Sequence, residues 1–388
     1  MLKRQKLKSK KVSKEELRLP KTSVLDDLNQ IKQVDKSNML SFCVDAPKHY
    51  GEAAKLAETV SVDYPKPQKI IAAGMGGSAI GGELFKDWAR DRLTIPIDVC
   101  REYSLPAYAD KNTLVFVVSY SGETEESLSA FLDAVKRKCM IVCISSGGAL
   151  QEYAKKLNVP HLRVPSGMAP RATLPYLFMP LPMLLEPMGL VSNVAQEVSE
   201  TTKVLKQISN ANSPEKPLSE NFSKKLASDV CGTIPVVYGF GIYRAVAQRF
   251  KTQFNENSKV PAKWEFFPEL NHNEIVGWEG AKEFAKALSV LLIRDSEEPP
   301  EIRQRIEFTK NRIREESVKT YEVQGIGKSV LAKMASVICI GDFTSVYLAV
   351  LRGIDPTPVK TIVSLKDTMK RVGVKEKVTR ELEKYASK

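Results

Sequence analysis

Histidine and cysteine are scarce in this sequence. Its 388 residues include 3 histidines and 6 cysteines, and no two cysteines have the CxxC spacing of zinc and thiol redox sites. Zinc sites and disulfide scaffolds depend on such residues, so we expect neither a metal centre nor a redox role. The cysteines lie mostly within apolar runs, where we expect reduced, buried side chains: Cys43, Cys100, Cys139, Cys143, Cys231 and Cys339.

Long apolar runs are also missing. No run approaches the roughly 20 residues that a membrane helix needs. The cationic N-terminus leads into KEELRLPK, where a secretory signal would have an apolar segment. Hydrophobic residues make up 43% and charged residues 27% of the chain, which is ordinary for a soluble globular protein. We therefore expect a cytoplasmic protein with no membrane partner.

Positive charge is in excess, but it is concentrated at one end. The chain has a net charge of +12, and its first 21 residues contain nine basic and two acidic residues, a net +7. The other 367 residues therefore carry only +5. We expect residues 1–22 to form a basic, flexible tail, and a nucleic-acid partner has no support outside that tail.

Short apolar strands alternate with amphipathic helices along most of the chain. The segments KIIAAG (69–74), NTLVFVV (112–118) and MIVCIS (140–145) are typical of buried strands. Between them, SGETEESLSAFLDAVKRK has acidic residues in its first turn and basic residues at its end, as the helix dipole favours. This alternation predicts an α/β fold with a mostly parallel sheet flanked by helices on both faces.

The strand, glycine turn and helix plan occurs twice. The segment KQISNANSPEKPLSENF, residues 206–222, is rich in Pro, Ser and Asn and is predicted to be a linker. Beyond it, IPVVYGFGIYRAVAQRF (234–250) repeats the plan of the first half without its serine. A chain of this length exceeds a single core. We predict two tandem doubly wound, flavodoxin-like domains, residues 23–205 and 223–388.

The glycine loop in IIAAGMGGSAIGG, residues 70–82, has two interpretations. As G-x-G-x-x-A, with Gly74, Gly76 and Ala79, it fits a dinucleotide fingerprint, and Asp98 then ends the next strand, where a ribose-binding acid belongs. As a glycine run that presents Ser78 at a helix N-terminus, it could bind a single phosphate. The first interpretation predicts an NAD-dependent dehydrogenase.

A second hydroxyl-rich loop favours the single phosphate. SYSGETEES, residues 119–127, places Ser119, Ser121 and Thr124 around a glycine at the start of a helix. Such hydroxyls can simply cap the helix. In a doubly wound sheet, however, both loops follow strands at the edge where ligands collect, and a dehydrogenase does not need the second loop.

Three further segments contain residues able to do chemistry. FFPELNHNEIVGWEG (266–280) contains His272 and Glu274, and a carboxylate there could move a proton between adjacent carbons. GMAPRATLPYLF contains Arg171, and DPTPVKTIVSLK contains Lys366. Taken singly, these are ordinary surface residues.

Together, the motifs resemble a known family. The order GMGGSAIGG, SYSGETEES, PRATLPYLF, NHNEIVGW and DPTPVKTIVSLK is similar to that of the archaeal and bacterial bifunctional phosphoglucose/phosphomannose isomerases, which consist of two sugar-isomerase (SIS) domains. The resemblance extends from about residue 23 to the C-terminus.

The resemblance implies a metal-independent aldose–ketose isomerase without a cofactor. It would interconvert glucose 6-phosphate, mannose 6-phosphate or both with fructose 6-phosphate through a cis-enediol, as a homodimer. An aminosugar-phosphate isomerase and a non-catalytic sugar-phosphate-binding regulator are alternatives with the same fold.

The resemblance also implies site residues. The sugar phosphate would be held by Gly76, Gly77, Ser78, Ser119, Ser121 and Thr124. Glu274 would transfer the proton, Arg171 would stabilise the enediolate and Lys366 would lie over the sugar. Tolerance of both epimers would come from Thr357 or Thr361.

Two positions depart from the family pattern. Glu123 stands where relatives typically have Asn, which adds a negative charge beside the phosphate loop. Pro299 stands where many relatives have a His associated with opening of the sugar ring. Ring opening would then depend on His272 or occur spontaneously, or the substrate differs.

Overall fold

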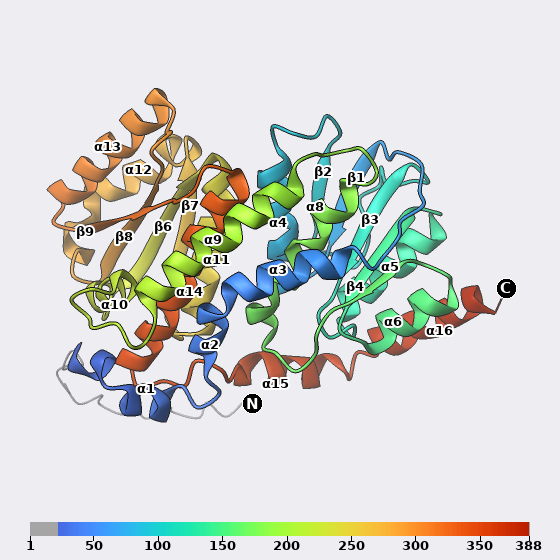
Figure 1. Ribbon diagram of the computed structural model, residues 1–388, viewed down its shortest axis with the longest axis horizontal. Coiled ribbons are helices and arrows are strands. Elements are labelled where there is room, and N and C mark those ends of the chain that lie inside the picture. Colours follow the sequence, from blue (N-terminus) through green and yellow to red (C-terminus); the bar gives the residue numbers. More distant parts are fainter. Residues whose placement is uncertain (1–21, 388) are drawn as a thin grey trace, which may run out of the picture.

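The computed structural model describes residues 22–387 (Figure 1). The basic tail expected over residues 1–22 lies outside the described residues, apart from its last residue. Two parallel sheets lie side by side, each flanked by helices, and long helices run across the junction between them (Figure 1). The expected α/β architecture is confirmed.

The first sheet has five parallel strands in the order β2-β1-β3-β4-β5. This is the flavodoxin-like order, as expected. The strands are β1 (Lys69–Ala73), β2 (Ile97–Cys100), β3 (Thr113–Val118), β4 (Met140–Ser145) and β5 (His161–Arg163). β3 and β4 are buried along their whole length, because helices cover both faces of the sheet.

The apolar side chains of these strands belong to two separate hydrophobic cores, one on each face of the sheet. Because side chains alternate along a strand, Leu114 and Phe116 of β3 belong to one cluster, and Val115 and Val117 belong to the other. The first cluster continues without a break into the second half of the chain. The two sheets therefore share one hydrophobic core.

The helices of the first half cover this sheet and extend across the junction toward the second one (Figure 1). They are η1 (Thr22–Asp26), α1 (Leu28–Val34), α2 (Met39–Val44), α3 (Ala46–Ala57), α4 (Gly77–Ala89), α5 (Glu125–Lys136), α6 (Gly148–Lys156), η2 (Pro170–Thr173), α7 (Leu174–Phe178), α8 (Pro180–Leu185) and α9 (Val194–Asn212). The 206–222 segment, expected as a linker, begins inside α9.

The second sheet repeats the plan with four parallel strands in the order β7-β6-β8-β9. Its strands are β6 (Ile234–Phe240), β7 (Lys263–Phe267), β8 (Leu288–Arg294) and β9 (Lys319–Gln324). The remaining helices are α10 (Phe222–Asp229), η3 (Gly241–Tyr243), α11 (Arg244–Glu256), η4 (Glu269–His272), α12 (Glu274–Gly277), η5 (Trp278–Phe284), α13 (Pro300–Glu315), α14 (Val330–Leu351), α15 (Lys360–Met369) and α16 (Val374–Ala386).

Helix α14 corrects one expectation. Within residues 22–387, this 22-residue helix alone is long and apolar enough to cross a membrane, so an apolar run of that length does exist. However, 94% of its most apolar 18-residue stretch is buried inside the protein. The helix packs there against α9, α10 and α11. A helix that is apolar on all sides is typical of the centre of a large core.

The C-terminal helix returns to the first sheet. Helix α16 packs against α5 and α6, and its Val378 and Leu382 belong to the core on that side (Figure 1). Lys156 of α6 and Glu383 of α16 form an ion pair with a 2.8 Å separation. The last helix of the chain therefore stabilises the first domain.

Burial of most of the cysteines is as expected. All six are free thiols, four of them buried and two half-buried. Burial raises the pKa of Cys139 to about 11, so this thiol is poorly reactive at neutral pH.

Candidate functional site

The two hydroxyl-rich loops lie together at the carboxyl edge of the first sheet. The 74–78 loop joins β1 to α4, and the 119–124 loop joins β3 to α5. β1 and β3 are hydrogen-bonded neighbours, whereas β2 lies on the other side of β1. The loops therefore flank the point where the strand order reverses, which is where α/β sheets bind ligands.

Direct contacts join the two loops. The Ser78 Oγ accepts a hydrogen bond from the backbone N–H of Tyr120 at 3.4 Å. The Ser119 hydroxyl donates to the Thr124 Oγ1 at 3.0 Å. Ser121 is exposed at the tip of its loop. The hydroxyls of Ser78, Ser119 and Thr124 thus form one polar cluster near the N-termini of α4 and α5.

The helix ends add backbone donors to this cluster. The first N–H groups of any helix have no partner within it, and they carry the positive end of the dipole. Gly76, the exposed residue before α4, has a φ of +52°, a conformation that favours glycine. A compact dianion such as a phosphate monoester is the ligand that this combination of donors suits.

Asp98 does not lie where a ribose-binding acid would have to be. The sequence predicted that Asp98 would end its strand, and this prediction is wrong. Asp98 is the second residue of β2, paired in register with Ile71, below the carboxyl edge of β1. Its Oδ2 accepts a hydrogen bond from the Tyr108 hydroxyl at 2.7 Å. This placement removes the support for a dinucleotide.

The matching turn in the second domain is filled by a side chain. Tyr243 stands at the place in the motif that Ser78 has in the first domain, and it is fully buried. Its hydroxyl donates to the Asp295 Oδ2 at 2.5 Å, and Lys333 Nζ lies 3.1 Å from Asp295 Oδ1. Because protein groups occupy this position, an arrangement suited to a phosphate is found in the first domain and not at this turn.

Arg171 lies beside the 74–78 loop. A β-carbon on Gly77 would be 3.7 Å from the Arg171 Cα. The guanidinium, 3% exposed, turns into the junction between the domains. It donates to Asn257 Oδ1 at 2.5 Å and to the Pro356 carbonyl at 2.6 Å. To bind an enediolate, Arg171 would have to exchange at least one of these partners.

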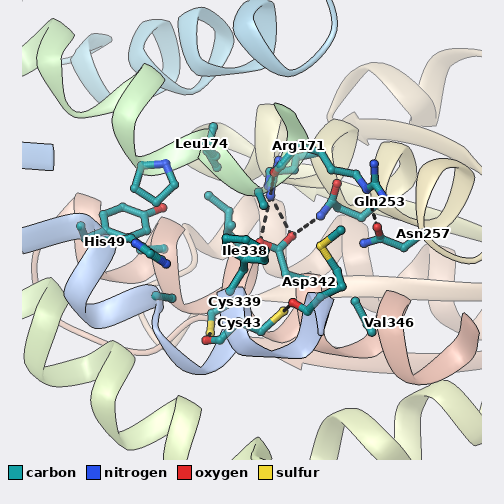
Figure 2. A pocket seen from close by; sticks show the side chains of 18 residues that line it. Cys43, His49, Arg171, Leu174, Gln253, Asn257, Ile338, Cys339, Asp342 and Val346 are labelled. Carbon is teal, nitrogen blue, oxygen red and sulfur yellow. Dashed lines mark hydrogen bonds and ion pairs between the residues drawn. The ribbon is translucent and has the colours of Figure 1, made fainter. Parts of the chain in front are cut away.

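Below Arg171 lies a cavity of about 30 Å³ (Figure 2). Asp342 of α14 accepts hydrogen bonds there from Arg249, at 2.9 and 3.0 Å, and from Gln253, at 2.8 Å. The same Arg249 donates to the Arg171 carbonyl at 3.1 Å. The cavity has the size of one or two waters and is too small for a sugar phosphate. It belongs to the scaffold that holds Arg171.

The segment with Thr357 is tied to the same scaffold. The Thr357 carbonyl accepts a hydrogen bond from Arg171 at 3.1 Å, and Lys259 Nζ donates to the Pro356 carbonyl at 2.7 Å. Burial, with the nearby charge of Arg171, lowers the pKa of Lys259 to about 8. Of the two threonines expected near the sugar, Thr357 is therefore the one that contacts Arg171.

Glu274 begins α12 on the second domain, and its side chain is only 13% exposed. Its Oε1 accepts a hydrogen bond from the Tyr238 hydroxyl at 2.8 Å, and its Oε2 pairs with Lys263. Within residues 22–387, no hydrogen bond or ion pair joins Glu274 to the phosphate loops. The structure places Glu274 and the two hydroxyl-rich loops on different domains.

The other predicted residues lie apart from this cluster. His272 is exposed at the end of η4, and Pro299 is the exposed residue before α13. Thr361 and Lys366 are exposed on α15, a helix none of whose residues is buried. In the described part of the chain, neither side chain reaches the phosphate loops through a hydrogen bond or an ion pair.

Sequence reasoning missed the residues that hold the predicted ones. Tyr238 was part of an apolar strand, yet a buried phenol must find a partner for its hydroxyl, and this was a usable signal. Lys263, on the adjacent strand, could have been paired with a carboxylate. The partners of Arg171 include Asn257 and Pro356, which come from distant segments and leave no local signal.

Comparison with known proteins gives a consistent family. Residues 219–369 match the family model described as the bacterial phospho-glucose isomerase C-terminal SIS domain. A bifunctional phosphoglucose/phosphomannose isomerase of Caldicellulosiruptor bescii is 39% identical over 337 residues, which is 86% of this chain and 99% of that protein. One from Aquifex aeolicus is 35% identical, over 81% of this chain and 94% of that protein.

A solved structure supports the fold. A glucose-6-phosphate isomerase like protein from Thermus thermophilus superposes with a TM-score of 0.59 at 19% identity, covering 87% of this chain and 99% of that chain. At this identity the likeness concerns the fold alone.

Proposed function

The chain belongs to the bifunctional phosphoglucose/phosphomannose isomerase family, and from that premise we propose that it interconverts glucose 6-phosphate and mannose 6-phosphate with fructose 6-phosphate. The observation that supports a phosphosugar substrate is the convergence of Ser78, Ser119 and Thr124 at the switch point of the first sheet. The Arg171 backbone lies next to this cluster, and its guanidinium would face the bound phosphosugar after it exchanges a partner in the domain junction.

The chemistry needs a base that moves one proton. Glu274 removes the proton from C2 of the open-chain aldose, the C–H electron pair forms the C1–C2 double bond, and O1 becomes the enediolate oxygen. A proton then passes from O2 to O1, Glu274 returns its proton to C1, and O2 becomes the ketose carbonyl. A fixed cation stabilises the enediolate, which is the proposed role of Arg171.

One site can serve both epimers. Glucose 6-phosphate and mannose 6-phosphate differ only in configuration at C2, and the planar enediol removes that difference. The site must then accept either orientation of the C2 hydroxyl, and Thr357, which contacts Arg171 through its carbonyl, is the proposed determinant.

The experiment incubates the purified protein with fructose 6-phosphate and excess EDTA, and it measures glucose 6-phosphate and mannose 6-phosphate separately. We expect both products. Formation of one product would restrict the substrate, and loss of activity in EDTA would contradict a metal-independent reaction. Absence of both products with and without EDTA would overturn the proposed function.

Replacement of the base tests the role of Glu274. Glu274→Gln should lower kcat by about 100-fold or more with little change in the binding of a phosphosugar, because the amide cannot accept the proton. Glu279→Gln, an exposed carboxylate in the same segment, is the matched control. Unchanged turnover in Glu274→Gln would exclude this residue as the base.

The proposal includes a cytoplasmic homodimer. Helix α15 exposes Ile362, Val363 and Leu365, which are 43%, 56% and 58% exposed, and a second copy of the chain could cover them. Light scattering after size-exclusion chromatography measures the mass in solution. A mass of one chain at micromolar concentration would contradict the dimer.

A further inference from the structure

The two carboxylate oxygens of Glu274 have partners of different kinds. Oε1 faces Tyr238, a fully buried phenol in the middle of β6. Oε2 faces Lys263, whose side chain is 55% exposed at the start of the edge strand β7. One partner is therefore fixed by the core, and the other is free to move away.

The direction of the buried hydrogen bonds is determined by chemistry. The indole Nε1–H of Trp278 lies 2.9 Å from the Tyr238 hydroxyl oxygen, and an indole N–H can only donate. The Tyr238 oxygen therefore accepts from Trp278, and its own proton points to Glu274 Oε1. Burial first, and then the charge of Glu274, raise the pKa of Tyr238 well above its usual value, so the phenol keeps this proton.

Packing holds this chain of donors in place. Trp278 is 5% exposed, and the rings of Tyr238 and Phe267 meet edge to face at 6.1 Å. Asn273 fixes the backbone, because its side chain accepts the hydrogen bond of the Glu274 N–H. Rotation of the carboxylate would break the bond from Tyr238 and leave its buried hydroxyl proton without an acceptor.

Charged groups of both signs lie around Glu274. Lys263 pairs with Glu274, Glu265 of β7 is an anion close to Glu274, and Glu269 of η4 lies close to Glu265 in turn. Burial and the charge of Glu274 raise the pKa of Glu265 above its usual range. Loss of Lys263 would therefore remove a positive charge beside Glu274 and leave the negative charge of Glu265 nearby.

We propose that Tyr238 and Lys263 are positioning residues for the isomerase reaction: Tyr238 fixes Oε1 so that Oε2 receives the substrate proton, and Lys263 places a positive charge beside Oε2 until substrate displaces it. This inference rests on the proposed function. It assigns separate roles to two residues outside the recognised motifs. Tyr238 acts on the orientation of the carboxylate and hence on kcat, and Lys263 acts through its charge and hence on the pH profile.

The experiment compares Tyr238→Phe and Lys263→Met with two matched controls. Tyr321 lies on β9, at the other edge of the same sheet, and Tyr321→Phe removes a hydroxyl that donates to the Asp229 carbonyl of α10. Lys319→Met removes the lysine that begins β9, and it is a matched control because Lys263 begins β7 in the same way. Wild-type activity is measured first, so that its absence overturns the proposed function independently of any variant.

The two variants should separate kcat from pH dependence. Tyr238→Phe should lower kcat by about 10-fold or more with KM within about twofold, because a hydrogen bond to a charged group is lost. Lys263→Met should move the acid limb of kcat/KM to higher pH, so that its deficit is severalfold at pH 6 and small at pH 8. Lys263→Arg should restore the wild-type profile.

Opposite results would overturn the inference. A Tyr238→Phe variant with wild-type kcat would show that the phenol does not orient the base. An acid limb that is unmoved in Lys263→Met, or moved equally in Lys319→Met, would exclude the role of Lys263. Since Lys263 is largely exposed, its replacement leaves the core intact and keeps the test valid if Tyr238→Phe fails to fold.

Discussion

Glu123 and Lys375, which are far apart in the sequence, form an ion pair beside the phosphate loop. Glu123 follows the glycine of that loop, and Lys375 lies in α16. The Glu123 Oε1 also accepts the Ala149 N–H at the start of α6, at 2.9 Å. The carboxylate of Glu123, which departs from the family pattern, is therefore paired with Lys375 and with the N-terminus of α6.

Loss of this lysine should weaken substrate binding. Lys375→Met leaves the Glu123 charge uncompensated near a bound phosphate, so we expect KM to rise about two- to fivefold at low salt with kcat unchanged. The effect should shrink at high ionic strength, because both partners are partly exposed. Steady-state kinetics at two salt concentrations measure it.

Lys377→Met is the control, because Lys377 is exposed on the same helix and has no ion pair within residues 22–387. A KM increase of the same size in both variants would indicate a general loss of positive charge and contradict the specific role of the Glu123–Lys375 pair.

Ser119 provides a test of the phosphate site. Its hydroxyl is 3.0 Å from that of Thr124, and both are proposed to bind the phosphate. Ser119→Ala should raise KM about 10-fold, since a hydrogen bond to a charged group contributes about 1.5 kcal/mol or more. Ser129→Ala, which removes a hydroxyl bonded to the Glu125 carbonyl on α5, should leave KM unchanged. Equal KM values in the two variants would argue against the site.

The 119–124 loop also depends on one glycine for its packing. Gly122 has a φ of +69°, and a β-carbon there would lie 1.8 Å from the Gly147 carbonyl oxygen. Gly353 has a φ of +63° with no atom near its missing β-carbon. Gly353→Ala should therefore lower the free energy of unfolding by about 1 to 2 kcal/mol from strain alone.

Gly122→Ala adds a collision with the backbone to the same strain. Its free energy of unfolding should therefore fall by about 2 kcal/mol or more beyond the decrease in Gly353→Ala. Urea unfolding of the two variants measures the difference. Equal losses would mean that the loop moves away from Gly147 without cost.

The first sheet and its loops were predictable because their signals are local. Buried strands, glycine turns and helix dipoles occupy short segments, and the parallel α/β plan then brings the loops of β1 and β3 together. The apolar character of α14 was a local signal too, and its 22 residues indicate a buried helix once both the length and the absence of a polar face are considered.

Long-range choices were not predictable. Val378 and Leu382 predict an apolar face on α16, but nothing local determines that it packs on the first sheet. The guanidinium of Arg171 likewise depends on Asn257 and Pro356, which only the folded chain brings near. The sequence indicated which residues could do chemistry but not which acceptors already hold them.

The contact between the two domains should make stability depend on pH. Asp87 of α4 is 7% exposed, and its Oδ1 lies 2.9 Å from Arg244 Nη2 of α11. Burial, only partly offset by Arg244, raises the pKa of Asp87 from 3.8 to about 6. Between pH 3.8 and about 6, the folded protein therefore binds a proton that the unfolded chain does not.

The sign of the effect follows from linkage. The contribution of Asp87 to stability is fully present below pH 3.8, falls as pH rises toward 6 and is constant above that. Asp87→Asn has no titrating group, so the free energy of unfolding of the wild type minus that of Asp87→Asn should be larger at pH 5 than at pH 7, by about 1 kcal/mol.

Urea unfolding at the two pH values measures this difference, with Asp91→Asn as the control at an exposed carboxylate just beyond the end of α4. The wild-type minus Asp91→Asn difference should be the same at both pH values. A wild-type minus Asp87→Asn difference that is larger at pH 7 would mean that the Arg244 ion pair outweighs the cost of burying the charge, which would reverse the role assigned to this domain contact.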